Sequence, residues 1–116
     1  MEIVPFLLAK KLKEKGFREK VNAYYGKHEN IFDVHPALDM NDADYRASAP
    51  TISQVLKWLR EENIHLYTDI DNEGWFFEIK CLKTRFMVNT DFFKRYRTCE
   101  LAALAGIEYV IDNNFI

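Results

Sequence analysis

Apolar residues in the middle of the chain recur with the spacing of an α-helix. Four of them fall at i, i+3, i+4 and i+7, which is a single helix face: Ile52, Val55, Leu56 and Leu59. Just before this stripe, Thr51 and Gln54 stand three residues apart. At that spacing a hydroxyl and an amide cap each other's free backbone N–H groups. The pattern predicts a helix from Ile52 to Glu62.

Helical spacing also predicts a helix near each end of the chain. Near the start, three apolar residues recur at intervals of four: Val4, Leu8 and Leu12. Pro5 suits a first turn and Gly16 suits a helix end, so we expect a helix from Val4 to Lys15. Thr98, with Glu100 behind it, is typical of a second helix start. The inward stripe of this last helix would be Leu101, Leu104, Ala105, Tyr109 and Val110.

Strands are predicted where apolar and polar residues alternate. One alternating run spans Phe17 to Tyr25. Two others, Ile64–Ile70 and Trp75–Leu82, flank the turn-forming residues Asp71 to Gly74, which predicts an antiparallel hairpin. A further strand over Arg85–Asn89 would extend the hairpin to a meander.

No regular pattern covers residues 27–50. This segment holds two of the three prolines and five acidic residues. We therefore expect a long loop that is partly packed down, with one short strand inside it as an open alternative.

The order of these elements is helix, strand, long loop, helix, two or three strands, helix. Strands that follow one another without crossover helices favour an antiparallel sheet. The sequence therefore predicts an α+β fold in which three helices pack on a small antiparallel sheet of about three to four strands. We expect a single domain spanning residues 1–116, because domains usually contain about 100–200 residues.

The composition excludes several classes of protein. Hydrophobic residues make up 48% of the 116 positions, and Gly and Pro together occupy only seven, which excludes a disordered tail or a collagen-like fibre. No apolar stretch reaches the ~18 residues needed to cross a bilayer. Two cysteines, Cys81 and Cys99, fit a reducing compartment better than a disulfide scaffold. We expect a cytoplasmic protein with no membrane partner.

No constellation of catalytic or metal-binding residues stands out. His28 and His35 lie seven positions apart, which is not a zinc-site spacing. The four glycines are scattered, so no phosphate-binding loop is present. We predict no enzymatic activity, no metal site and no cofactor. Cys99, at a helix start, is the better candidate for a reactive thiol, although a plain structural cysteine is the simpler interpretation.

Positive charge gathers in two segments of a chain whose net charge is −2. Residues 10–20 contain six Lys and Arg against two Glu, and residues 80–97 contain six against one Asp. The cations of the second segment are Lys80, Lys83, Arg85, Lys94, Arg95 and Arg97. Because aromatic residues interleave with them, this segment is a candidate nucleic-acid-binding surface. The alternative is that the charges are solvated and the rings belong to the core.

Large aromatic residues occur on both faces of the predicted strands and on the middle helix. Four of them are candidate anchors of a protein interface: Trp58, Tyr67, Trp75 and Phe76. An exposed aromatic patch usually marks an interaction surface. The alternative is that the loop over residues 27–50 folds across it.

Three segments resemble a group of small proteins common in gut Bacteroidetes genomes and their prophages. The segments are Ile3–Lys13, Ala49–Arg60 and the stretch from Tyr96 through Glu100 to Tyr109. The sequence departs from the group at Lys94–Arg95, where an acidic pair often precedes the Ala-rich helix. The resemblance implies a phage or mobile-element origin and a bacterial cytosolic setting, and it assigns no catalytic or binding residue.

Two functions follow as hypotheses. The first is a non-catalytic protein-interaction module that self-associates or binds another protein through the aromatic residues. The alternative is a nucleic-acid-binding protein that uses the basic, aromatic-rich segment over residues 80–97.

Overall fold

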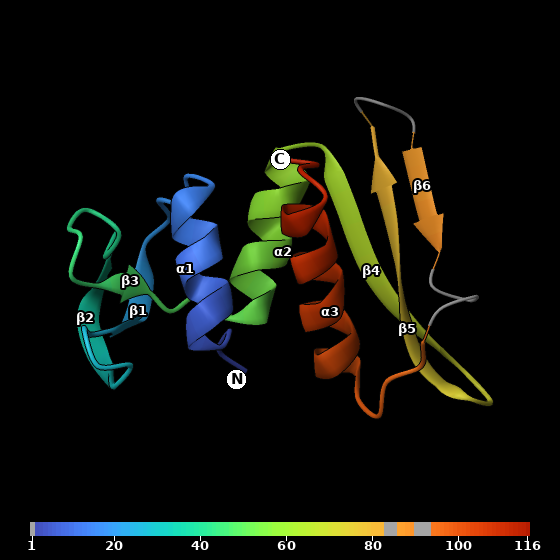
Figure 1. Cartoon of the computed structure of the whole chain (residues 1–116), viewed down its shortest axis with the longest axis horizontal. Coiled ribbons are helices and arrows are strands. Elements are labelled where there is room, and N and C mark those ends of the chain that lie inside the picture. Colours follow the sequence, from blue (N-terminus) through green and yellow to red (C-terminus); the bar gives the residue numbers. More distant parts are fainter. Residues whose placement is uncertain (1, 83–85, 90–93) are drawn as a thin grey trace. The chain divides into compact units, whose positions relative to one another are not determined.

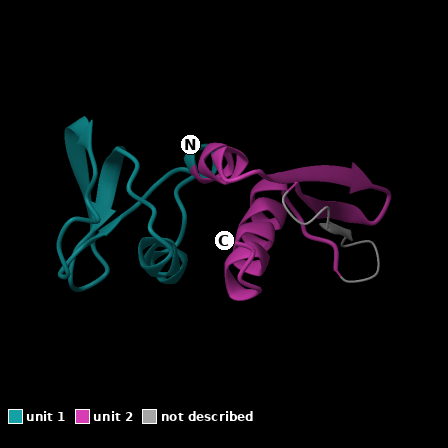
Figure 2. Cartoon of the chain, turned by 90° about the horizontal axis from the view of Figure 1, so that it is seen from above, with its two compact units in different colours: residues 1–54 teal, residues 55–116 magenta. Residues whose placement is uncertain are grey.

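The computed structural model describes residues 2–82, 86–89 and 94–116. This part of the chain contains three α-helices and six β-strands, arranged in two antiparallel three-stranded sheets (Figure 1). The predicted α+β class and the three helices are confirmed. The strands form two sheets, however, where a single sheet was predicted. The chain divides into two compact units, residues 1–54 and 55–116 (Figure 2), so the prediction of one domain stays a prediction.

The first unit contains one helix and one sheet. Helix α1 spans Phe6–Glu14, and strands β1 (Val21–Tyr25), β2 (Ile31–Leu38) and β3 (Ala47–Ser48) form a sheet in the order β2-β1-β3. The helix is shorter than predicted, because Pro5 is its N-cap residue and Lys15 its C-cap. The predicted helix stop is confirmed: Gly16 has a φ of 91°, and the N–H of Phe17 bonds back to the Leu12 carbonyl at 3.0 Å.

The prediction of a long loop over residues 27–50 was wrong, because β2 and β3 lie within it. Strand β2 is an edge strand, and most of its side chains are exposed, so it lacks the alternation that marks a half-buried strand. Pro36 interrupts the run, and a proline is tolerated in a sheet only at an edge or a bulge. The pairing with β1 is indeed irregular between Val21 and Ala23. Strand β3 has only two residues, too few for any periodicity.

A buried asparagine ties the segment before β3 to the end of α1. The Asn41 side chain donates to the carbonyl of Phe17 at 2.7 Å and accepts from the backbone N–H of Ser48 at 2.7 Å. The Ser48 hydroxyl in turn accepts from the backbone N–H of Met40 at 3.0 Å. These bonds satisfy backbone groups that would otherwise be buried without partners.

Helix α2 (Ile52–Glu61) has the start that the sequence predicts. The Thr51 N–H donates to Gln54 Oε1 at 2.9 Å, and the Gln54 N–H donates to Thr51 Oγ1 at 3.1 Å. Both bonds of the capping box are therefore made.

The second unit contains a sheet covered by a helix. Strands β4 (Ile64–Asp71), β5 (Gly74–Cys81) and β6 (Phe86–Asn89) pair in that order, which confirms the predicted meander. Helix α3 (Cys99–Asp112) is capped by the Thr98 hydroxyl, which accepts from the Leu101 N–H at 3.1 Å. It lies close to β4 and β5 at Gly106, where an added Cβ would come within 2.5 Å of a Leu66 methyl group.

We predict that Asn41→Ala destabilises the protein. The substitution removes the bonds to the Phe17 carbonyl and the Ser48 N–H, and loss of a partner by a buried polar group costs about 1–3 kcal/mol. Urea denaturation measures the loss. The control is Asn22→Ala, which removes a bond from an exposed side chain to the Val34 carbonyl and should cost less than about 0.5 kcal/mol. Equal losses in the two variants would contradict the role assigned to Asn41.

Candidate functional site

The four aromatic residues predicted as interface anchors differ in exposure. Trp58 and Phe76 are each only 8% exposed, which agrees with the alternative that the patch is covered, and their role as interface anchors stays a prediction. Tyr67 and Trp75 are half-buried. Strand alternation places Phe76 on the outer side of the hairpin, but it does not reveal whether another segment covers that side.

Arg95 lies over the ring of Phe76. Its guanidinium carbon lies 4.7 Å from the centre of the Phe76 ring. The same guanidinium donates twice to Asp71 Oδ2, from Nε at 3.0 Å and from a terminal nitrogen at 2.7 Å. The neighbouring residue, Tyr96, pairs with Trp75 through two backbone bonds of 2.8 and 2.9 Å. Arg95 therefore holds the segment after β6 against the β4–β5 hairpin.

The candidate nucleic-acid-binding cations do not act as one set. Arg95 is occupied by Asp71 and Phe76. Lys80, Lys94 and Arg97 are exposed, whereas Lys83 and Arg85 lie outside the described residues. Lys80 and Lys94 each lie over a tyrosine ring, at 5.6 and 5.3 Å from its centre. The hypothesis of a nucleic-acid surface at residues 80–97 stays a prediction.

Tyr67 forms a cross-strand pair with Glu78, its register partner on β5. The phenol donates to Glu78 Oε2, and this bond raises the pKa of Tyr67 to about 12. His65 lies beside the ring, with the two ring centres 5.2 Å apart. Because Glu78 and Lys80 already contact it, Tyr67 is held in place as part of the sheet surface.

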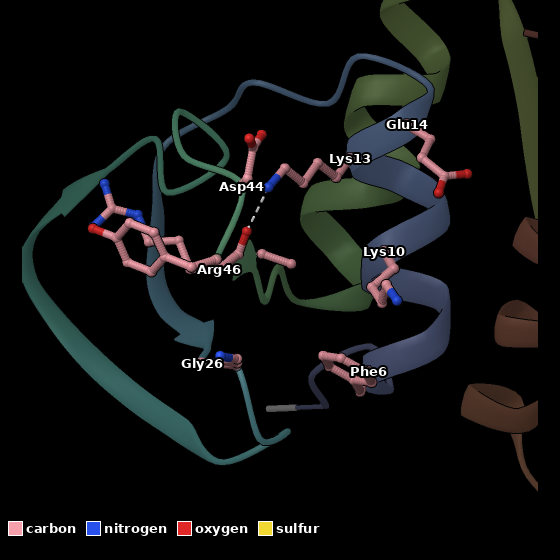
Figure 3. A pocket seen from close by; sticks show the side chains of 10 residues that line it. Phe6, Lys10, Lys13, Glu14, Gly26, Asp44 and Arg46 are labelled. Carbon is pink, nitrogen blue, oxygen red and sulfur yellow. Dashed lines mark hydrogen bonds between the residues drawn. The ribbon is translucent and has the colours of Figure 1, made fainter.

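The first unit contains a cleft of about 460 Å³ that three segments line (Figure 3). Helix α1 contributes Phe6, Lys10, Lys13 and Glu14, the β1–β2 turn contributes Gly26 and Lys27, and the segment into β3 contributes residues 44–47. Four cationic residues and two acidic residues therefore line one cleft. Below it is called the basic cleft.

Internal contacts occupy two of the four cations of the basic cleft. Lys13 donates to the carbonyls of Ala43 and Arg46, the second at 2.7 Å, as Figure 3 shows. Arg46 bonds to Asp42, and this bond lowers the pKa of the Asp42 carboxyl. Lys10 and Lys27 are exposed, and neither forms an ion pair with another described residue. Their charges are the ones that a ligand could meet.

The second unit contains a smaller cavity of about 300 Å³ between α3 and the sheet. Three aromatic residues, Phe77, Tyr96 and Tyr109, line it together with two acidic residues of α3, Glu108 and Asp112. Burial and the charge of Glu108 raise the pKa of Tyr96. Below it is called the acidic cavity.

The sequence analysis missed both sites. It identified the basic run at residues 10–20 but not its companions Lys27 and Arg46, which are isolated in the sequence. It treated Tyr109 only as a core position of the last helix. The spacing of Glu108 and Asp112, four residues apart on that helix, was a signal that could have marked the acidic cavity.

Metal binding, membrane insertion and cysteine chemistry add no further site among the described residues. No group of three or more His, Cys, Asp or Glu residues in this part of the chain could hold a metal ion. No helix there combines the length and apolar character needed to span a bilayer. Cys81 and Cys99 are not joined in a disulfide; Cys81 is buried, and Cys99 Sγ lies 3.2 Å from the Thr68 hydroxyl.

Comparison with known protein families, curated proteins and solved structures finds no match to this chain.

We predict that the Asp71–Arg95 contact makes stability depend on pH. The bonds from Arg95, followed by the backbone bond from Glu73, hold the pKa of Asp71 at about 2, below its ordinary value of 3.8. A pKa that is lower in the folded state stabilises the protein above pH 3.8, and this stabilisation is lost as the pH falls through about 2.

The measurement compares the unfolding midpoints of the wild-type protein and Asp71→Asn across this range. We expect the wild type to be more stable at neutral pH and the difference to shrink as the pH falls from about 4 to 2. Glu73→Gln, an exposed carboxylate in the same turn, is the control and should show no such trend. A difference that stays constant with pH would contradict the contribution of the Asp71 charge.

Proposed function

We propose that this protein is a small, non-catalytic, cytoplasmic protein-interaction module that recognises a positively charged side chain of a partner protein. The observation that carries the proposal is the acidic cavity, which combines three aromatic rings with two carboxylates. The phage or mobile-element origin that the resemblance implies belongs to the same proposal.

The rings of the acidic cavity suit a cation. An ammonium or guanidinium group is attracted to the face of an aromatic ring, and methylated amines are recognised in this way. The Phe77 and Tyr109 ring centres lie 6.0 Å apart, and Phe115 packs edge-on against Tyr109 at 6.0 Å. Tyr109 is therefore held between two neighbours, which fixes a ring wall before any ligand arrives.

The carboxylates supply the charge that selects a cation over an apolar side chain. Glu108 and Asp112 lie one turn apart on the same side of α3. Glu108 is exposed and close enough to Tyr96 to raise its pKa. A cation in the cavity would thus meet a ring and a negative charge together.

The size of the cavity favours one side chain over a larger ligand. Its volume of about 300 Å³ lies at the lower end of the range for sites that hold small molecules. A single lysine, methyl-lysine or arginine side chain of a partner fits this description better than a cofactor does.

We predict that short peptides carrying a central arginine or trimethyl-lysine bind to the acidic cavity. NMR titration of the full chain should shift the amide signals of α3, with norleucine in the same peptide as the uncharged control. Glu108→Gln should weaken binding by about 2–5-fold, because an exposed charge contact contributes up to about 1 kcal/mol. Glu100→Gln, an exposed residue in the first turn of the same helix, is the matched control.

Two outcomes would contradict this proposal: equal binding of the norleucine peptide, or equal loss of affinity in the two glutamate variants. Sedimentation of the protein at several concentrations tests whether the partner is a second copy of this chain. If the protein associates with itself and Glu108→Gln reduces the association, the partner is a second copy of this chain.

A further inference from the structure

We infer that the basic cleft of the first unit binds a nucleotide, with its phosphate at Lys10 and Lys27 and its base against Tyr45. This site lies in a different unit from the acidic cavity and has the opposite charge. It is therefore independent of the proposed protein interaction.

The phosphate end of the site is defined by two lysines from different segments. Lys10 belongs to α1, and Lys27 belongs to the turn between β1 and β2. Both ammonium groups are exposed, and neither has an ion-pair partner among the described residues. Lysine binds phosphate as a point charge with three donors, so two lysines on different walls of a cleft suit an anion between them.

The cleft also contains two acidic residues, Glu14 and Asp44. In Figure 3 the Glu14 side chain points away from Arg46 and the segment into β3. Asp44 lies near Lys13, whose ammonium group donates to two backbone carbonyls. Neither carboxylate forms an ion pair with Lys10 or Lys27.

The base end of the site is defined by aromatic rings. Tyr45 is 64% exposed, which is unusual for a large ring, and the Arg46 guanidinium lies 5.4 Å from its centre. Bases stack on exposed aromatic rings whatever their sequence. Phe6 is a second ring of the cleft: Tyr25 packs edge-on against it at 5.4 Å, and the Lys10 ammonium lies 5.5 Å from its centre.

The walls of the cleft are fixed without a ligand. Lys13 bonds α1 to the carbonyls of Ala43 and Arg46, and Asp42 holds the Arg46 side chain. Asn41 anchors the same segment to the end of α1. A site that is ordered in advance loses less entropy on binding.

Size and charge favour a single nucleotide over a long strand. The volume of about 460 Å³ lies within the range for small-molecule sites. Residues 1–54 contain eight Lys and Arg against eight Asp and Glu, so the attraction is local to the cleft. A bound strand would need an extended positive track.

The experiment is an NMR titration of the full chain with AMP in about 20 mM NaCl, where screening of exposed charges is weak. We expect saturable shifts at α1 and at residues 44–47. Parallel titrations use inorganic phosphate, adenosine and a thymidine decamer. The Lys10→Ala/Lys27→Ala variant should bind AMP at least about tenfold more weakly, because both phosphate contacts are lost.

The matched control is Lys20→Ala/Lys57→Ala, which removes the same charge from exposed positions outside the cleft and should leave the affinity unchanged. Tyr45→Ala should weaken AMP binding several-fold, whereas Tyr45→Phe, which keeps the ring, should not. Circular dichroism and the unfolding midpoint show that each variant is folded.

The outcomes separate the parts of the inference. Absence of saturable shifts, or equal loss of affinity in the two lysine variants, overturns it. Inorganic phosphate bound as tightly as AMP contradicts the role of the base, and adenosine bound as tightly as AMP contradicts that of the phosphate. If the thymidine decamer binds more tightly than AMP, the cleft recognises a nucleotide that belongs to a strand. The contacts to the phosphate and the base are then the same. The acidic-cavity variants leave all of these results unchanged.

Discussion

An arginine that lies on an aromatic ring and is held there by an aspartate occurs in both units, and the structure of each unit depends on it. In the second unit, Asp71 holds Arg95 over Phe76. In the first unit, Asp42 holds Arg46 over Tyr45 and beside Tyr24. A three-stranded sheet in so short a chain has too few helices to cover both of its faces. Arginine has a planar, weakly hydrated guanidinium group, which can lie on a ring while its charge stays paired.

This constraint also determines which cations remain for ligands. Arg46 and Arg95 are used to hold segments in place, and Lys13 is used in the same way through backbone carbonyls. Counting positive residues along the chain therefore overestimates the charge that a partner would meet. Lys10 and Lys27 have no such role among the described residues, so their charges remain exposed in the cleft.

Local sequence signals predicted the elements that local interactions form. The capping box at Thr51 and Gln54 and the β4–β5 hairpin were both predicted from spacing, because their bonds join residues close in sequence. Strands β2 and β3 were missed because β2 is an edge strand that contains a proline and has mostly exposed side chains, and β3 has only two residues.

The candidate sites could not be predicted from the sequence for a related reason. The exposure of Phe76 depends on Arg95, which lies beyond β6 in the sequence. The basic cleft depends on Lys10, Lys27 and Tyr45 meeting across three segments, which only the pairing of β1 with β2 and β3 brings together. Residue spacing describes one element at a time, so it does not show which residues of different elements lie close together.

The two sites also differ in how their charge is maintained, and this difference bears on the kind of function each supports. In the basic cleft, Asp42 pairs with the arginine while the two lysines stay exposed, so their positive charge is hydrated. In the acidic cavity, the negative charge lies beside rings that are partly buried, as the raised pKa of Tyr96 indicates. Hydrated charges attract a soluble anion at little desolvation cost, whereas charges beside buried rings select a cation that brings apolar surface with it. A side chain of another protein is such a cation, which is why the acidic cavity, the smaller of the two, supports the protein-interaction function.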